Sequence, residues 1–290
     1  IFLSNNIAKG DLLMKLLYLG TAAAEGWPAP FCQCENCKAA RIKKGKNIRS
    51  RPQVLINDDL LMDYGPDTFC HSLQYDLNLD LVKTVLLTHS HCDHFHPLDL
   101  ILRSTPYAFG QDHEALRLFG NEKCRRMYED LLIHTESPEQ LADFVSFSEV
   151  HAFSPFPSGN YQILPLKAVH DPRENCLLYA VSDSCGKTIF YGNDTGSICP
   201  ETWDAIRPLH FDLVSLDCTM GTGGAYTGHL NLEGCFAIRE QMLQAGCADA
   251  ATTFVITHFS HGCCPLHDEL SALAAAGGFM TAYDGFSVTV

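Results

Sequence analysis

The sequence predicts an α+β fold in which two β-sheets pack face to face and helices cover them. Short apolar runs of strand length come in clusters, helix-patterned segments lie between the clusters, and 46% of the 290 residues are hydrophobic. Such a chain can bury a large core and layer sheets against helices. We expect a single domain over residues 14–290, with an insertion at about 95–160 and an N-terminal extension at 1–13.

The first third of the chain is expected to be rich in strands. Residues 14–19 form a short apolar run, and 20–51 form a long irregular segment. Residues 53–56 and 60–63 are apolar runs separated by three polar residues, which predicts a hairpin. Residues 82–88 predict another strand, which ends in a histidine-rich motif.

The middle of the chain is harder to interpret. Residues 112–133 have helical spacing, and 134–160 are polar and rich in proline and serine. We therefore expect a lid-like insertion at about 95–160.

The last third is expected to alternate between strands and helices. Strands are expected at 161–169, 177–182, 188–191, 213–216, 253–257 and 286–290, and helices at 200–207, 232–245 and 266–276. The strands come in clusters that look antiparallel, which suits a sandwich of two sheets.

The charge balance excludes one class of partner. The chain has 34 acidic and 20 basic residues, for a formal net charge of −14. Long nucleic acid is bound mainly by neutralising phosphates with lysine and arginine, so we expect no such partner. A small phosphorylated substrate remains compatible, because bound cations reverse the sign of the charge locally. No run is long and apolar enough to span a membrane, and a homodimer is left open.

The 14 cysteines indicate a reducing compartment. Most lie in apolar stretches, where a reduced thiol behaves as a small hydrophobic group. Residues 1–13 lack the basic and apolar regions of a signal peptide. We therefore expect a cytoplasmic protein with free thiols.

The strongest functional signal is the run HSHCDH at residues 89–94, which directly follows an apolar strand. Imidazole and carboxylate groups suit zinc and similar divalent ions, and a hydrolytic site keeps one position open for water. The ordinary alternative, a polar turn with scattered histidines, is improbable at this spacing. We expect Ser90 and Cys92 to be spacers that point away from the metal.

Three later residues are further candidates. His170, Asp194 and His258 each follow directly after an apolar strand run. Taken singly, each is as easily an ordinary surface or capping residue. Their joint occurrence with the H-x-H-x-D-H run predicts enough ligands for two metal ions.

These residues, in this order, resemble the metallo-β-lactamase superfamily from about residue 14 to the end. The resemblance implies a four-layer αββα sandwich with two metal ions at one edge. It assigns three ligands to each ion and one carboxylate to both: His89, His91 and His170 to the first, Asp93, His94 and His258 to the second, and Asp194 to both. Such a site makes the chain a metal-dependent hydrolase, because water between two divalent cations is nucleophilic near neutral pH. Zinc or manganese is expected, with iron as an alternative.

A second metal site is predicted by the run CQCENC at residues 32–37. Cys32, Cys34 and Cys37 have the spacing to chelate one tetrahedral zinc with a fourth ligand, and zinc would order a segment that packing cannot. Three free surface thiols are the ordinary alternative.

This early C-x-C-x-x-C run resembles the cyclic phosphodiesterase of the bacterial phosphonate-degradation pathway (the PhnP-like subgroup). Its relatives include the B protein of pyrroloquinoline quinone biosynthesis. The resemblance implies that His261 is the fourth zinc ligand. Cys263, Cys264 and His267 are local competitors for that position.

Two residues near the expected helix at 232–245 complete the candidate site. In the resembled phosphodiesterases a histidine in a similar helix-opening segment faces the substrate, which implies a role for His229 as a general acid or phosphate contact. A histidine without a role is the alternative, because helix N-termini attract polar residues. Asp217, at a strand end, is a candidate partner for a metal-bound histidine.

The function that follows is a binuclear hydrolase of a small phosphodiester, cyclic esters included, with Asp93, Asp194 and His229 as catalytic residues. Hydrolysis of a thioester or lactone on the same metals is the alternative within enzymes. A cofactor-biosynthesis protein that resembles the quinone-pathway relative is the alternative outside hydrolysis.

Overall fold

The computed structural model describes residues 13–110, 114–135, 138–224 and 226–290. The extension expected at 1–13 therefore lies, except for its last residue, outside the described residues.

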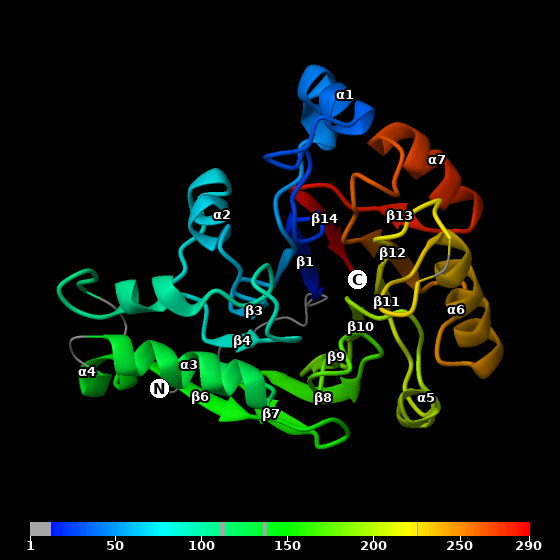
Figure 1. Ribbon diagram of the computed structural model, residues 1–290. Coiled ribbons are helices and arrows are strands. Elements are labelled where there is room, and N and C mark those ends of the chain that lie inside the picture. The colour runs from blue at the N-terminus through cyan, green and yellow to red at the C-terminus, as the bar shows by residue number, and fades with distance from the viewer. Residues whose placement is uncertain (1–12, 111–113, 136–137, 225) are drawn as a thin grey trace, which may run out of the picture.

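The described strands form two seven-stranded sheets that pack face to face (Figure 1). The first has the order β14 (Phe286–Thr289), β1 (Lys15–Gly20), β2 (Gln53–Ile56), β3 (Leu60–Met62), β4 (Thr84–Leu86), β5 (Leu116–Gly120), β6 (Val145–Glu149). The second has the order β13 (Met280–Thr281), β12 (Thr253–Thr257), β11 (Leu213–Asp217), β10 (Thr188–Gly192), β9 (Leu177–Asp183), β8 (Tyr161–Lys167), β7 (Phe156–Ser158). Both sheets are mixed rather than antiparallel, because β3 to β6 and β10 to β13 pair in parallel.

Helices flank both sheets. They are α1 (Glu35–Lys43), α2 (Thr68–Gln74), α3 (Glu122–His134), α4 (Pro138–Ala142), α5 (Pro200–Ile206), α6 (Leu232–Ala245) and α7 (His267–Ala276), with 3-10 helices η1 (Gly45–Asn47) and η2 (Pro97–Arg103). The αββα sandwich is thus confirmed.

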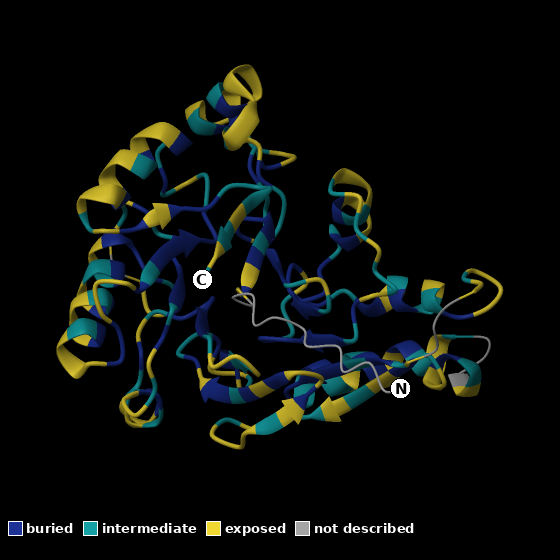
Figure 2. Cartoon of the chain, turned by 180° about the vertical axis from the view of Figure 1, so that it is seen from behind, coloured by how far each residue is buried: buried dark blue, intermediate teal, exposed yellow. Residues whose placement is uncertain are grey.

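Three hydrophobic clusters fill the three interfaces between the four layers. Successive residues of a strand point to opposite faces, so Leu16 and Tyr18 of β1 lie between the sheets while Leu19 faces outward. The outer face of the first sheet packs against α3, and that of the second packs against α5, α6 and α7. Figure 2 shows buried residues concentrated in the sheets and exposed residues on the outer sides of the helices.

The structure corrects two expectations about irregular segments. Residues 20–51 contain α1 and η1, and the helical spacing at 112–133 covers a strand, β5, as well as α3. The reason is that β5 is a short, almost wholly buried run, which periodicity cannot distinguish from a buried helical turn.

The lid-like insertion expected at about 95–160 is also corrected. This segment supplies β5 and β6 to the first sheet and β7 to the second, so it extends both sheets.

The topology brings many strand ends to one edge of the sandwich. β3 and β4 are parallel in the first sheet, and β10, β11 and β12 are parallel in the second. Residues that directly follow these strands therefore meet at a common edge, which is where the candidate site lies. No described helix is long and apolar enough to cross a membrane.

Candidate metal centre

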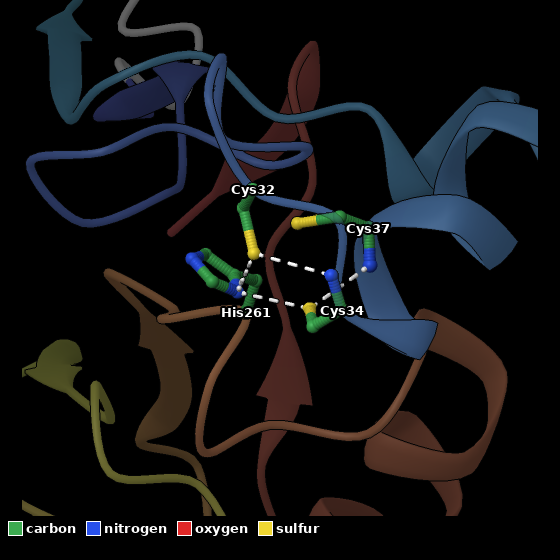
Figure 3. A group of neighbouring side chains, drawn as sticks. All are labelled: Cys32, Cys34, Cys37 and His261. Atoms are coloured by element: carbon green, nitrogen blue, oxygen red, sulfur yellow. Dashed lines mark hydrogen bonds between the residues drawn. The ribbon is translucent and has the colours of Figure 1, made fainter.

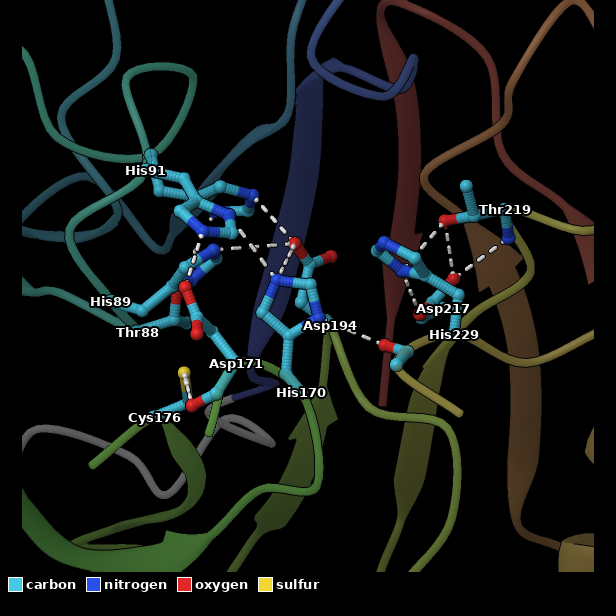
Figure 4. Close-up of polar contacts among 12 residues, drawn as sticks. Thr88, His89, His91, His170, Asp171, Cys176, Asp194, Asp217, Thr219 and His229 are labelled. Atoms are coloured by element: carbon cyan, nitrogen blue, oxygen red, sulfur yellow. Dashed lines mark hydrogen bonds and ion pairs between the residues drawn. The ribbon is translucent and has the colours of Figure 1, made fainter. Parts of the chain in front are cut away.

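The predicted ligands of the first ion lie together at this edge. The ligand atoms of His89, His91 and His170 are all within 4.8 Å of one another. His170 Nε2 lies 3.2 Å from His91 Nδ1, and the rings of both histidines pack edge-on against His89 (Figure 4).

The predicted ligands of the second ion form an adjoining group. The ligand atoms of Asp93, His94 and His258 are also within 4.8 Å of one another, and all three residues are buried. His94 Nε2 lies 3.2 Å from Asp93 Oδ2, and His258 Nε2 lies 3.7 Å from the same oxygen.

Asp194 lies between the two groups. Its Oδ2 atom is 3.0 Å from His94 Nε2, 3.5 Å from His89 Nε2 and 3.7 Å from His170 Nε2, and its Oδ1 atom is 3.1 Å from His258 Nε2. A carboxylate in this position can reach an ion in either group, as a bridging ligand must.

The other ring nitrogens of the histidines are held by neighbouring groups. His94 Nδ1 donates to Asp63 (2.7 Å) and His170 Nδ1 donates to the carbonyl of Gly228 (2.9 Å). His89 Nδ1 contacts Thr88 Oγ1 at 3.0 Å, and His258 Nδ1 contacts Thr219 Oγ1 at 2.7 Å. Each contact leaves Nε2 directed at the cluster, which is how metal-binding histidines are oriented.

The two threonines link these histidines to buried carboxylates. Thr88 donates to Asp63, and Thr219 donates to Asp217 at 2.6 Å. Each hydroxyl can therefore accept a hydrogen bond from the N–H of its histidine while it donates a hydrogen bond to the aspartate.

The cluster fits metal ions because its central atoms lack other partners. Four buried atoms, His89 Nε2, His94 Nε2, His258 Nε2 and Asp194 Oδ1, have no hydrogen-bond partner among the described residues. Buried polar atoms are almost always paired, so four unpaired donor and acceptor atoms that face one another fit a metal-binding site better than a packing defect. This donor set of imidazole and carboxylate is consistent with a binuclear centre.

The electrostatics of the cluster favour cations. Burial alone would raise the pKa of Asp194, but His258 and His94 hold it well below its usual value. Burial lowers the pKa of His89 and keeps this ring neutral, as a metal ligand must be. Burial also disfavours charge on His94, yet Asp93, Asp194 and Asp63 together raise its pKa. The buried carboxylates of Asp63, Asp93 and Asp194 therefore lie close together, and bound cations would stabilise them.

His229 lies beside the cluster and is held by Asp217. Its Nδ1 atom donates to Asp217 Oδ2 at 2.8 Å, and its ring lies 4.7 Å from that of His170. Burial opposes a charge on His229, but Asp217 raises its pKa to about 9. The ligand atoms of His170, Asp194 and His229 lie within 4.8 Å of one another, so His229 reaches the same space as the candidate ligands.

Several supporting residues were not singled out from the sequence. Asp63 is fully buried and orients His94, and Asp171 Oδ2 lies 3.1 Å from His91 Nε2. Asp63 directly follows a strand, so the strand-end argument used for Asp194 could have found it. Ser90 was expected to be a spacer, and its hydroxyl bonds Glu174.

The candidate zinc site brings its four predicted residues together (Figure 3). The ligand atoms of Cys32, Cys34, Cys37 and His261 are within 4.8 Å of one another, and His261 Nδ1 lies 3.4 Å from Cys34 Sγ and 3.8 Å from Cys32 Sγ. The backbone N–H of Cys37 bonds the Cys34 sulfur and lowers the pKa of that thiol to about 6, whereas burial raises the pKa of Cys37 to about 11. Cys34 is thus available as a thiolate at neutral pH.

The structure separates His261 from two of its three local competitors, Cys264 and His267. Cys264 is buried, with its sulfur against the carbonyls of Cys218 and Thr219, and His267 accepts from the guanidinium of Arg49. The group formed by the three cysteines contains His261 and neither of these two residues.

Comparison with known proteins places the fold. A family model described as a beta-lactamase superfamily domain matches residues 59–259. The chain is 27% identical over 163 residues to an octanoyltransferase of Porphyromonas gingivalis, an alignment that covers 54% of this chain and 31% of that protein. The chain therefore spans about a third of the length of this curated relative.

Solved structures with the same fold cover nearly the whole chain. A diphosphatase from the PhnP family has a TM-score of 0.75 at 22% identity and covers 96% of this chain and 98% of its own. Zn(2+)-bound PqqB from Methylobacterium extorquens has a TM-score of 0.70 at 18% identity, with 95% and 100% covered. The human short-form tRNase Z has a TM-score of 0.64 at 17% identity, with 94% and 98% covered.

Proposed function

The chain belongs to the metallo-β-lactamase superfamily, and from that premise we propose that it is a binuclear metal-dependent phosphodiesterase acting on a small phosphodiester, cyclic esters included. The family match gives the chain the fold of this superfamily, and the geometry shows buried His/Asp clusters. The phosphodiester substrate is the step that we propose.

The observation that carries this proposal is the pair His229 and Asp217 beside the candidate ligands. When a phosphodiester is hydrolysed, the departing alkoxide is a strong base that must gain a proton. His229 is held by Asp217 at 2.8 Å through Nδ1, and Asp217 favours its protonated form. Its Nε2 atom can therefore deliver a proton to a leaving group held at the cluster.

Each other residue has a defined task. His89, His91, Asp93, His94, His170 and His258 would hold two divalent ions, and Asp194 would contact both. Two such ions lower the pKa of a water molecule and neutralise charge that develops on a phosphoryl oxygen. The proximity of the titratable groups to one another, in a buried site, is typical of catalytic centres.

The test is a substrate panel on protein reconstituted with manganese or zinc. Bis-p-nitrophenyl phosphate and cyclic phosphates should be hydrolysed, and elemental analysis should find two equivalents of metal beyond the zinc of the cysteine site. A protein that cleaves thioesters or lactones but no phosphodiester would overturn the proposal. So would a cluster that never holds more than one ion.

Thioester hydrolysis is the second candidate, because the matched curated relative is named for octanoyl transfer. A thiolate is a weak enough base to leave without protonation, so this reaction would not need His229. Efficient thioester cleavage by the wild type that is unchanged in His229→Ala would favour this second candidate, and no thioester cleavage by the wild type would argue against it.

A further inference from the structure

A cavity of about 1010 Å³, lined in part by His261 from the loop that follows His258, has no role in the reaction so far. Its walls come from residues 24–32, residues 48–51, the start of α2 and the loop after β12, and include Glu25, Phe31, Arg51, Asp67 and His261. The volume is in the range of sites that hold small molecules.

Two walls of the cavity are continuous with the candidate ligand loops. The turn at Gly65, two residues before Asp67, packs so closely on the carbonyl of Asp93 that an added Cβ would lie 2.2 Å from it. On the other side, the backbone of Ala23 bonds Phe259, which directly follows His258, and Ser260 donates to Glu25 at 2.6 Å. These contacts hold two walls of the cavity against the loops that carry Asp93 and His258.

The wall formed by residues 24–32 is attached to the candidate zinc site. Cys32 and His261, which lie side by side in Figure 3, both line the cavity. The zinc cluster therefore joins this wall to the loop that carries His258.

The side chains in the cavity suit a neutral group with hydroxyls and a flat ring. Arg51 is already paired with Asp67 through two hydrogen bonds of 2.9 and 2.5 Å, so the pair has no net charge to attract a second phosphate. Glu25 accepts from Ser260 through Oε1, so its other oxygen, Oε2, can accept a hydrogen bond from a hydroxyl group of a ligand. Phe31 is 99% exposed at the rim, where a ring can stack on it.

We propose that this cavity is the subsite for the half of the phosphodiester that keeps the phosphate, and that it takes a nucleoside-like group stacked on Phe31 and bonded to Glu25. The inference rests on the proposed phosphodiesterase function, in which the leaving group faces His229 and the retained group must extend elsewhere. An acidic and aromatic wall of this kind selects a nucleoside over a longer polyanion.

The test compares two esters with the same leaving group. Manganese-loaded protein is assayed with the p-nitrophenyl ester of thymidine monophosphate and with ethyl p-nitrophenyl phosphate. The wild type should prefer the thymidine ester by about tenfold in kcat/KM, the size of effect that base stacking on an aromatic ring supplies. Phe31→Ala should remove most of this preference by raising KM for the thymidine ester, while kcat/KM for the ethyl ester stays the same. Glu25→Gln should also reduce the preference for the thymidine ester.

Phe109→Ala is the matched control, because Phe109 is also highly exposed but lines a different cavity. Equal use of the two esters by the wild type, or equal losses on both in Phe31→Ala, would overturn the subsite. If neither ester is cleaved, the phosphodiesterase proposal fails. In that case, calorimetry with thymidine monophosphate tests whether the cavity binds a nucleoside. A Kd about tenfold weaker in Phe31→Ala than in the wild type supports the subsite, and equal Kd values overturn it.

Discussion

At the scale of single residues, the site depends on three backbone positions that L-amino acids rarely adopt. Asp63, Asp194 and His258 have φ values of 63°, 57° and 63°. Such left-handed conformations cost free energy and persist where surrounding contacts hold them. Asp63 and His258 directly follow a strand and Asp194 is the second residue after one, so the unusual turn directs each side chain into the site instead of along the sheet.

Asp194→Asn should abolish turnover while the protein stays folded. Asparagine tolerates the left-handed conformation of this position, but an amide cannot bind two cations as a carboxylate does. We expect a loss of at least about 100-fold in kcat, which is the scale of losing a central electrostatic group. Activity assays, metal analysis and melting curves check this. Near-normal kcat would show that Asp194 is not the bridge, and Asp194→Ala should lose activity equally.

His229→Ala should slow hydrolysis of an unactivated alkyl phosphodiester by about 10²–10⁴-fold. Hydrolysis of p-nitrophenyl esters should fall much less, because nitrophenolate leaves without a proton. Equal losses on both substrates would indicate binding instead of acid catalysis.

The pH profile provides the readout specific to this role. Asp217 raises the pKa of His229 to about 9, so the protonated acid is present below that pH and is lost above it. Bound cations move this limit downward. Activity on the alkyl ester should therefore decline on the alkaline side, and Asp217→Asn should move the decline to lower pH. An alkaline limb that is identical for both ester types would contradict the assignment.

At the scale of elements, α1 begins at the candidate zinc cluster and packs few of its side chains against the core. Only Cys37 and Ala40 of this helix are buried, so packing contributes little to its stability. Its N-cap is Cys34, whose sulfur accepts from the backbone N–H of Cys37. The same sulfur belongs to the candidate zinc cluster, so metal binding and helix capping act on one residue.

Cys34→Ser should lower the melting temperature and release one equivalent of zinc, while the active-site metals remain. The reason is that zinc binding to such a site is linked to the free energy of folding. Cys185→Ser is the matched control, because Cys185 is an exposed free thiol like Cys34 but lies in the turn between β9 and β10. Unchanged zinc content and stability in Cys34→Ser would rule out the zinc site.

At the scale of the whole molecule, a buried polar network joins segments that are far apart in the sequence. The hydroxyl of Ser50 lies 2.7 Å from His71 Nε2 on α2 and 2.6 Å from Asp284 before β14. His71 Nδ1 donates to Gln53 of β2 at 2.7 Å. This network holds α2 and the C-terminal loop against the first sheet.

His71 should make the protein sensitive to acid. Burial lowers the pKa of His71 from an ordinary value of about 6.5 to about 4 in the fold. The unfolded chain therefore takes up a proton between these values that the folded protein does not. Stability is complete above about pH 6.5 and declines as the pH falls toward 4, by at most about 3 kcal/mol.

Melting curves from pH 4 to 8 compare wild type with His71→Gln. The melting temperature of the variant should fall less than that of the wild type as the pH is lowered. Loss of metal at low pH affects both proteins, so it does not contribute to the difference between them. His151→Gln, at an exposed position, is the control. Parallel pH dependence in wild type and His71→Gln would contradict the assignment.

The sequence by itself determined the chemistry of the sites. The H-x-H-x-D-H run, the three strand-end residues and the C-x-C-x-x-C run are local patterns, and the structure brings all of them together as groups. Apart from the two-residue strand β13, which was not predicted, the strands and helices of the last third were also predicted closely, because they have clear periods and turn residues at their ends.

Only the tertiary structure decided what depends on contacts between distant segments. Strand pairing is such a contact, so β5, β6 and β7 were mistaken for a lid until their neighbours in the sheets were known. The choice of His261 over the cysteines of the same loop depends on which side chain of that loop lies beside Cys34. The positions of Asp63 and Thr88 behind the histidines likewise follow from packing. Local sequence limits which groups can bind a metal or begin a helix, but close approach between distant segments is set by how the whole core packs.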